Sequence, residues 1–495
     1  MRILTLGAAC LIFGAACPAT EAPATASLQN HYVPTRGYRL EPLPDPPRYV
    51  RNLGNTGIEA FRGLDWLDAG LDFRTRYEYR ENDYRPWTDT SSGKPVSKFR
   101  SDPDSLWLLR TRAYLGIHDI LDPLRFAVEF QDSRSYNGLY ERSDTDVNEF
   151  ELIQGYAELY FKNPFGLDRP LSVRAGRMHL ELLDRRLVAN NEFRNTTNNF
   201  EGFRVHLGKK ENEWDVDVFA FQPVERRKYQ FDRPDEDTWF YGGVMSLRQW
   251  SEWITVQPYF FGRAVNGDPY NPVAKNRKAD ASIYAPGLRV YGVLSKTGFD
   301  YEADVNKQFG RVGSLSGTKQ TLQQHDTLAY SLELGYTFNH DWKPRMSTFF
   351  GYGTGDKGSK DKINQRFDSF YGFNQPWSRN DYFSWDNVLA PKARLEFTPH
   401  KDVRIDTGYN AYWLESSAGG WRRTGLGDGK GKTFLGHEFD IRLRHKLNSR
   451  VDWSLSYAHF TPGNYTTSLA KSAKGPYTTE PSNFFYFEVS VSALE

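Results

Sequence analysis

The residues of this chain whose type and spacing best suit a chemical role are arginines placed at alternate positions. In LDFRTRYEYR, residues 71–80, Arg74, Arg76 and Arg80 share one parity, and apolar, aromatic or threonine residues fill the other. A guanidinium group is planar, permanently charged and able to donate two parallel hydrogen bonds to one carboxylate. A row of such groups would attract and bind anions.

The same spacing returns in later segments, and the apolar set of each segment defines which residues share the charged side. That side carries an excess of arginine, and the candidate anion-binding residues are Arg74, Arg76, Arg110, Arg112, Arg125, Arg174, Arg204, Arg394, Arg404, Arg442 and Arg444. Lys392 shares that side. Acids also occur there, namely Asp72, Glu129, Glu158, Asp300, Glu302, Asp304, Glu396, Asp406 and Asp440.

Two interpretations of these charges remain open. The arginines could form a ring that attracts and passes an anionic solute. Alternatively, each arginine could be bonded to a neighbouring acid and do no more than hydrate a protein wall. The cationic excess favours the first interpretation for the set, and the second is the better one for any single arginine.

Patterns for catalysis or metal binding are weak. The segment GYGTGDKG, residues 351–358, lacks the spacing and the following helix of a phosphate loop, and the end of a strand explains it better. Histidines are scattered over different segments without paired ligand spacing, at His118, His206, His325, His437 and His459. We therefore expect no catalytic residue, no metal and no cofactor.

The elements that must position the arginines are β-strands, because a period of two dominates from Trp66 onward. A barrel strand tilted in a membrane needs about 10 residues. We expect about eighteen strands, with sixteen as the alternative, beginning near residues 69, 105, 123, 148, 170, 199, 213, 238, 253, 282, 298, 325, 344, 388, 403, 435, 450 and 482.

Two all-β architectures produce this alternation. In a soluble sandwich the apolar face forms the core, whereas in an outer-membrane barrel it meets lipid and the charged face lines the interior. The even strand number, the aromatic content of 15% and a strand at the end of the chain favour a single antiparallel transmembrane barrel. An arginine facing lipid at mid-depth costs about 2–4 kcal/mol, so the charged side should face an aqueous interior.

The N-terminal residues are typical of an exported protein. MRILTLGAACLIFGAA, residues 1–16, has one basic residue, a short apolar run and small residues. We expect a signal peptide at 1–22, a proline-rich irregular segment at 23–65 and the barrel at 66–495. No disulfide framework is expected from Cys10 and Cys17, the only cysteines. The net charge of +1 gives no drive toward nucleic acid.

One long stretch combines several motifs in a fixed order. In AGRMHLELLDRRLVANNEFRNTTNNFEGFRVHL, residues 175–207, a Gly-Arg start is followed by Asp and Arg, an aromatic-x-Asn stretch and a Phe-acid-Gly before a strand. This stretch resembles the alginate export family of outer-membrane barrels. The matching residues are Gly176, Arg177, Asp184, Arg186, Phe193, Asn195, Phe200, Glu201 and Gly202.

Three further stretches agree with that family in order. WLLRTRAYLGI (107–117) resembles its early Arg-x-Arg strand, and GYGTGDKGSKDKINQRFDSFYG (351–372) resembles its Gly-Asp loop with a following Phe-Asp. LGHEFDIRLRHKLNSRVDWSLSYAHFTPGNY (435–465) resembles its Gly-x-Glu-x-Asp strand and the ending of its penultimate strand. The similarity covers roughly residues 105–494.

The resemblance implies a porin-like outer-membrane channel, not an enzyme, through which an anionic polysaccharide such as alginate leaves the cell. By motif it places Arg110 and Arg112 in an electropositive constriction. The expected partners are an anionic polysaccharide or a small anionic solute, outer-membrane lipid and periplasmic secretion proteins. Two rival functions are an outer-membrane barrel enzyme and a secreted soluble β protein that binds carbohydrate.

Overall fold

Strand β2, Leu67–Glu81, shows what the alternating residues do. Leu71 and Phe73 are 44% and 40% exposed on the outer surface, whereas Asp72 and Arg74 point inward and are 8% and 3% exposed. Successive side chains of a strand point to opposite faces, so this alternation separates an apolar outer wall from a charged interior. The structure therefore confirms the expected direction of the charged side.

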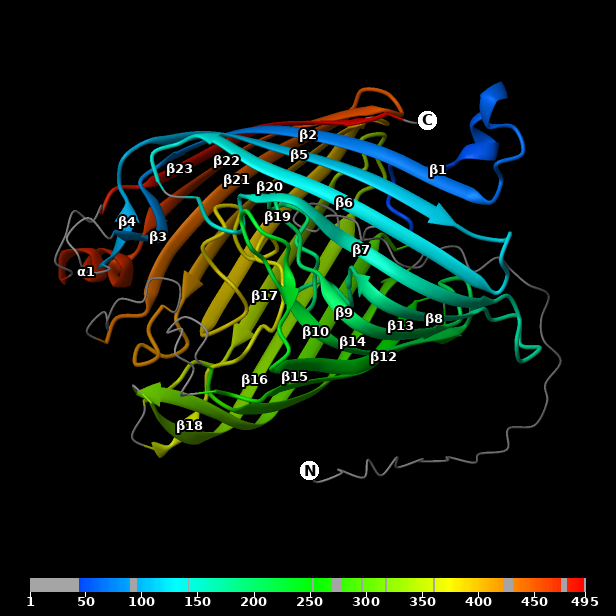
Figure 1. Ribbon diagram of the computed structural model, residues 1–495. Helices are drawn as coiled ribbons and strands as arrows, with labels where there is room; N and C mark the ends of the chain where they lie inside the picture. Colours follow the sequence, from blue (N-terminus) through cyan, green and yellow to red (C-terminus); the bar gives the residue numbers. More distant parts are fainter. Residues whose placement is uncertain are drawn as a thin grey trace.

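The chain forms one closed antiparallel barrel in this computed structural model (Figure 1). The structure describes residues 44–493 except 90–95, 141, 252, 269–277, 295–296, 317, 359–360, 422–430 and 473–478. The expected signal peptide lies outside the described residues. Within them, eighteen strands follow one another around the wall in sequence order, and pairing of the last strand with β2 closes it.

The bounds of the wall strands are close to the sequence-based expectation. They are β2 Leu67–Glu81, β5 Asp104–Ile117, β6 Leu124–Asn137, β7 Asn148–Phe161, β8 Leu171–Met178, β9 Phe200–Leu207, β10 Trp214–Glu225, β12 Thr238–Ser251, β13 Ile254–Val265, β14 Ala281–Leu294, β15 Phe299–Ser316, β16 Lys319–Thr337, β17 Arg345–Gly353, β19 Val388–His400, β20 Val403–Trp413, β21 Phe434–Lys446, β22 Val451–Pro462 and β23 Ser482–Ser492.

Strand β16 is the one that begins well before its expected start near residue 325. It starts at Lys319 and pairs with the equally long strand β15 along a hairpin that ends at Ser316. Residues 311–324 are mostly polar on both parities, so no apolar face marks this part of the hairpin. Backbone pairing alone continues the strands there.

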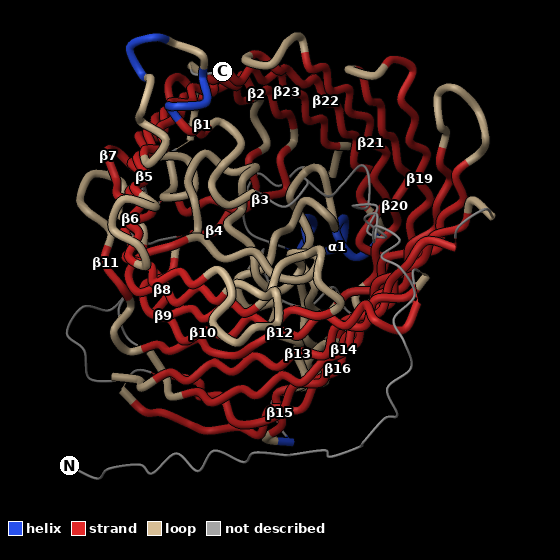
Figure 2. Tube along the Cα trace, turned by 90° about the vertical axis from the view of Figure 1, so that its right-hand side faces the viewer, coloured by secondary structure: helices blue, strands red, loops and turns tan. Residues whose placement is uncertain are grey.

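The two ends of the barrel differ in the length of their connections. At the short-turn end the strands join through brief connections such as 118–123, 208–213 and 401–402. At the long-loop end the connections include 179–199 and 354–387. Figure 2 shows loop segments inside the ring of strands, where they cross the interior.

Smaller elements of secondary structure lie at both ends of the barrel. β1 Val50–Asn52 pairs with the first residues of β2 at the short-turn end, where two short 3₁₀ helices follow, η1 Leu53–Thr56 and η2 Glu59–Phe61. At the long-loop end lie β3 Asp83–Asp89, β4 Val96–Arg100, β11 Arg233–Pro234, β18 Ile363–Asn364 and α1 Asn464–Ser472. In the described part of the chain, no helix is long and apolar enough to cross a membrane.

Candidate functional site

The eleven arginines selected from the sequence all point into the barrel, at two depths. The deep arginines are only 2–6% exposed and come from the middle of their strands: Arg74, Arg76, Arg110, Arg112, Arg394 and Arg442. The mouth arginines have side chains 16–24% exposed and lie near the short-turn end: Arg125, Arg174, Arg204, Arg404 and Arg444. Arginine side chains therefore lie inside the barrel at both depths, but only those near the short-turn end are partly exposed.

Strand register places several of these arginines directly opposite one another. Arg74 of β2 faces Arg110 of β5. Arg174 of β8 faces Arg204 of β9, and Arg404 of β20 faces Arg444 of β21. Like charges that face each other across neighbouring strands repel, so each pair requires carboxylates nearby. The source of those carboxylates differs from pair to pair.

For the pair Arg74 and Arg110, one carboxylate is that of Glu488 in β23, 3.6 Å from Arg74, and another comes from the loop between β8 and β9, residues 179–199, which we call inner loop 1. Glu192 of this loop forms an ion pair with Arg110 and a second with Arg112, at 3.1 Å between Oε2 and Nη1. Burial alone would raise the pKa of Glu192, but Arg110, Arg112 and Arg74 outweigh burial and hold that pKa well below its usual range. Glu192 is therefore a fixed anion within the barrel.

The main chain of inner loop 1 also faces the deep arginines. Arg74 donates to the carbonyl oxygens of Glu192 at 2.9 Å and Arg194 at 2.8 Å, and Arg76 donates to that of Phe193 at 2.6 Å. The guanidinium carbon of Arg76 also lies 4.4 Å from the centre of the Phe193 ring. The arginines of β2 thus hold a loop in place as well as carrying charge.

Asn195 fixes the same loop to the wall. Its amide nitrogen lies within hydrogen-bonding distance of the carbonyl oxygens of Leu109, Arg134 and Asp146, at 2.9–3.1 Å. The main-chain carbonyl of Asn195 accepts a hydrogen bond from the hydroxyl of Ser133 at 2.7 Å. The position of inner loop 1 therefore rests on both ionic and amide contacts.

A second loop, residues 354–387 between β17 and β19, also lies inside the barrel and is called inner loop 2. Glu438 of β21 accepts from the hydroxyl of Ser378, the backbone amide of Arg379 and the side-chain amide of Asn380, each at 2.7 Å. The carbonyl of Trp377 accepts from the hydroxyl of Tyr412 at 2.6 Å. Inner loop 2 is thus bound to the wall at β20 and β21.

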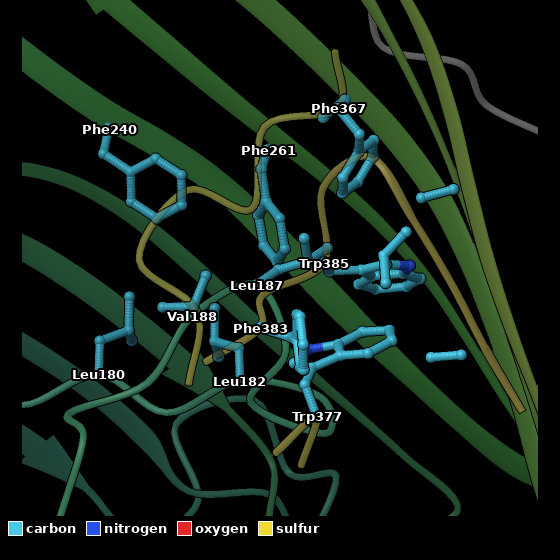
Figure 3. Close-up of a cluster of buried hydrophobic side chains, with 14 of the residues drawn as sticks. Leu180, Leu182, Leu187, Val188, Phe240, Phe261, Phe367, Trp377, Phe383 and Trp385 are labelled. Atoms are coloured by element: carbon cyan, nitrogen blue, oxygen red, sulfur yellow. The ribbon is translucent and has the colours of Figure 1, made fainter. Parts of the chain in front are cut away.

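The two inner loops join in the middle of the barrel. The backbone amides of Tyr371 and Phe373 donate to the carbonyls of Leu187 and Arg185 at 3.0 and 2.9 Å. Side chains from both loops and from strands β12 and β13 belong to a large buried apolar cluster, of which Figure 3 labels Leu180, Leu182, Leu187, Val188, Phe240, Phe261, Phe367, Trp377, Phe383 and Trp385. A packed core of this kind resists displacement far more than a solvated loop does.

On the side of β19–β21, wall residues supply the carboxylates. Asp406 accepts from Arg442 at 3.3 Å and from Arg444 at 3.0 Å. Arg394 donates to Glu396 at 2.9 Å, and Arg404 lies 3.9 Å from the same carboxylate. Each acid is thus shared by more than one arginine, which leaves this side of the short-turn mouth rich in positive charge.

Among the residues of the inner loops, the sequence marked Asn195 through the family motif but did not single out Glu192 or the indoles of Trp377 and Trp385. These residues lie in connections without alternation, so no periodic signal marks them. Among the described residues, no three His, Cys, Asp or Glu side chains lie together as a metal site requires.

Comparison of the sequence with protein families gives one match over most of the chain. The family described as "Alginate export" matches residues 65–477. The search of curated proteins finds no match.

Comparison with solved structures finds outer-membrane porins of low sequence identity. A BenF-like porin from Pseudomonas fluorescens Pf-5 has a TM-score of 0.54 at 9% identity, with 87% of this chain and 99% of that chain covered. OccAB1 of Acinetobacter baumannii has a TM-score of 0.54 at 10% identity, with 86% and 96% covered. OccK2 (OpdF) of Pseudomonas aeruginosa, solved in complex with glucuronate, has a TM-score of 0.52 at 11% identity, with 86% and 96% covered. At such identities the likeness shows the fold.

Proposed function

The chain belongs to the alginate export family, and we propose that it is a passive export channel for an anionic polysaccharide of the alginate type. As a member of this family with a porin fold, it is an outer-membrane barrel channel. The polysaccharide as its cargo, and the arginines as the groups that select it, are our inference. Smaller anionic solutes that carry a carboxylate belong to the same chemical class and would enter by the same route.

One observation carries this proposal, namely the set of inward arginines in directly opposed pairs. Each repeat of a polyuronate carries a carboxylate, and a guanidinium group binds a carboxylate through two parallel hydrogen bonds. The pairs near the mouth, Arg174 with Arg204 and Arg404 with Arg444, would bind successive carboxylates of the polymer as it enters. The glucuronate complex of OccK2 (OpdF) supports a uronate as the recognised sugar.

The proposal needs no catalytic step in the barrel. Synthesis at the inner membrane would drive the polymer outward, and periplasmic secretion proteins would deliver it to the short-turn end. The short turns of outer-membrane barrels generally face the periplasm and the long loops face the outside. A signal peptide at residues 1–22, followed by the segment 23–65, would bring the chain to that membrane.

Current recordings from the purified protein in planar lipid bilayers test the proposal. Under a potassium chloride gradient, the reversal potential should show a preference for chloride over potassium. Addition of a mannuronate hexamer should then reduce the current, and a neutral maltohexaose of similar length should reduce it much less. A preference for potassium, with no difference between the two hexamers, would exclude an arginine-selected anion channel.

A further inference from the structure

The segment that precedes the barrel turns into the short-turn mouth instead of projecting away from it. β1 adds to β2, with Val50 paired to Gly70. Just before it, the hydroxyl of Tyr49 donates to the carboxylate of Glu129 on the inner face of β6, and the Tyr49 side chain is buried. This anchor leads the preceding residues along the inner wall, past β6 and β7.

Asp45 lies at the far end of this anchored segment and contacts Arg174 of β8. Its carboxylate forms an ion pair with Nη1 of Arg174, and Nε of the same guanidinium donates to Glu158 at 2.9 Å. The Asp45 side chain remains 42% exposed. Burial opposes its ionisation, but Arg174 and Arg204 outweigh burial and keep the pKa of Asp45 below its ordinary value. A water-accessible carboxylate therefore lies on an arginine of the inner wall.

The wall around Arg174 explains why an added carboxylate binds there. Across neighbouring strands, Arg125, Glu158, Arg174 and Arg204 lie in one row. Arg125 has Asp119 as a partner at 3.1 Å, and Nε of Arg204 donates to Asp217 at 3.0 Å. Each arginine of the row therefore has one acid beside it, but Glu158 bonds only Nε of Arg174 and leaves Nη1 of that guanidinium for a further carboxylate.

The guanidinium of Arg174 is also held in position for that anion. Its central carbon lies 4.6 Å from the centre of the Tyr156 ring, and Glu158, which fixes its Nε edge, is also bonded by the hydroxyl of Ser172. With one edge fixed by Glu158 and one face covered by Tyr156, the Nη1 side is the one turned toward Asp45. A rigid guanidinium loses little entropy when it binds a carboxylate.

We propose that Arg174, with Arg204 beside it, forms a uronate-binding subsite at the periplasmic mouth, and that Asp45 occupies this subsite as a tethered competitor. This inference rests on the proposed function and adds to it a location and a form of self-regulation. The Asp45 carboxylate stands in the place of a sugar carboxylate. The polymer must displace it to enter the barrel.

Competition with the tethered Asp45 carboxylate discriminates between anionic ligands by their length. A carboxylate on a short tether acts at an effective concentration in the millimolar range. A single uronate at lower concentration therefore competes poorly with Asp45. A polymer carries many carboxylates, of which several bind neighbouring arginines such as Arg125 and Arg204 while one replaces Asp45. Asp45 thus favours long anionic chains over small metabolites.

The test compares D45N with the wild type in planar bilayers, with a mannuronate hexamer as the blocking probe. Removing the competitor should lower the hexamer concentration for half-maximal block by about tenfold, the size expected for one ionic hydrogen bond. A second variant, R174Q, should weaken the block by the hexamer both in the wild type and in D45N. Asp45 lies in an exposed, irregular segment outside the wall strands, so the barrel itself should assemble normally in D45N.

Glu59→Gln is the matched control, because Glu59 belongs to the same N-terminal segment and its side chain is 94% exposed in η2. It should leave the half-blocking concentration unchanged. Suppose that the hexamer blocks D45N at the same concentration as the wild type, while the wild type prefers chloride and is blocked by the hexamer. In that case Asp45 is not a competitor, and the channel function stands. If the wild type shows neither chloride preference nor block, the channel function fails and the subsite fails with it.

Discussion

Arg74 and Arg110 lie directly opposite each other in β2 and β5, and both guanidinium groups donate to the same carbonyl oxygen, that of Glu192. The distances are 2.9 Å from Arg74 and 3.4 Å from Arg110. Two like charges that would repel across the sheet are thereby both directed at one inner loop. The main chain of inner loop 1 and the carboxylate of Glu192 together hold this pair of charges.

This arrangement predicts that E192Q loosens inner loop 1. The amide keeps the size of the side chain but removes the charge that pairs with Arg110 and Arg112, and local opening should become easier by about 1–3 kcal/mol. Hydrogen exchange of the amides of residues 179–199 should then be faster than in the wild type.

Chloride conductance should rise in the same variant, because the deep arginines are left with less negative charge between them. Glu149→Gln is a suitable control, since Glu149 is a partly exposed side chain that lies near Arg134 and outside the inner loops. Unchanged exchange in E192Q would mean that the ion pairs contribute nothing to holding the loop.

A separate prediction concerns the amide of Asn195. N195A removes the donor to the carbonyls of Leu109, Arg134 and Asp146, and the Oδ1 that accepts from Arg74 at 3.2 Å, without removing any charge. Leaving buried carbonyls without a partner should destabilise the docked loop by about 1–3 kcal/mol, again measured by hydrogen exchange of residues 179–199.

In N195A, unlike E192Q, the preference for chloride over potassium should stay at the wild-type value, since no charge changes. Asn212→Ala serves as the control, because Asn212 makes its hydrogen bonds in a short connection at the other end of the barrel. A large change of ion preference in N195A would show that the loop position, not the arginine charge, governs selectivity.

The contacts of Glu192 also show which part of the site the sequence does not predict. The wall could be predicted because the parity of a residue such as Phe73 or Arg74 decides whether it meets the outer surface or the interior. Glu192 belongs to an aperiodic connection, and its inward position depends on contacts with Arg110 and Arg112, far away in the sequence. No local pattern encodes such contacts, so the interior appeared open where two loops in fact cross it.

The mouth arginines give the most direct test of selectivity. Arg404 and Arg444 have side chains 21% and 24% exposed and lie beside the wall carboxylates Glu396 and Asp406, so their replacement by Gln removes positive charge at the mouth. A charge near a water-filled mouth contributes about 1 kcal/mol at contact distance, so each variant should lower the chloride-to-potassium permeability ratio by up to about fivefold.

R110A and R112A should lower this ratio too, but they also release Glu192 and so change the conductance through the loop. K307Q is the control for the mouth variants, since Lys307 lies on the outward parity of β15 and its side chain is 50% exposed. A permeability ratio that is unaffected in the mouth variants would mean that these arginines serve only to balance their neighbouring acids.

The last prediction is a dependence on pH of the connection between β10 and β12, residues 226–237. Asp232 in this connection is 4% exposed, and burial together with the nearby Glu151 raises its pKa to about 6. Its carboxylate accepts from the backbone amide of Arg227 at 2.7 Å and the side-chain amide of Asn148 at 2.8 Å. Because the folded loop binds this proton more tightly than the unfolded loop does, the loop is most stable near or below pH 4 and loses stability as the pH rises through about 6.

The loss in stability of this loop amounts to at most about 3 kcal/mol, which is equivalent to a shift of about two pKa units. Protection of the amides of residues 226–237, corrected for intrinsic exchange, should therefore fall between about pH 4.5 and about pH 7.5. D232N should abolish this dependence, because an amide carries no titrating charge and Asn148 can turn its carbonyl toward it. Asp341→Asn, an exposed residue in the connection between β16 and β17 at the short-turn end, should leave the dependence intact, and a rise of protection with pH in the wild type would contradict the assignment to Asp232.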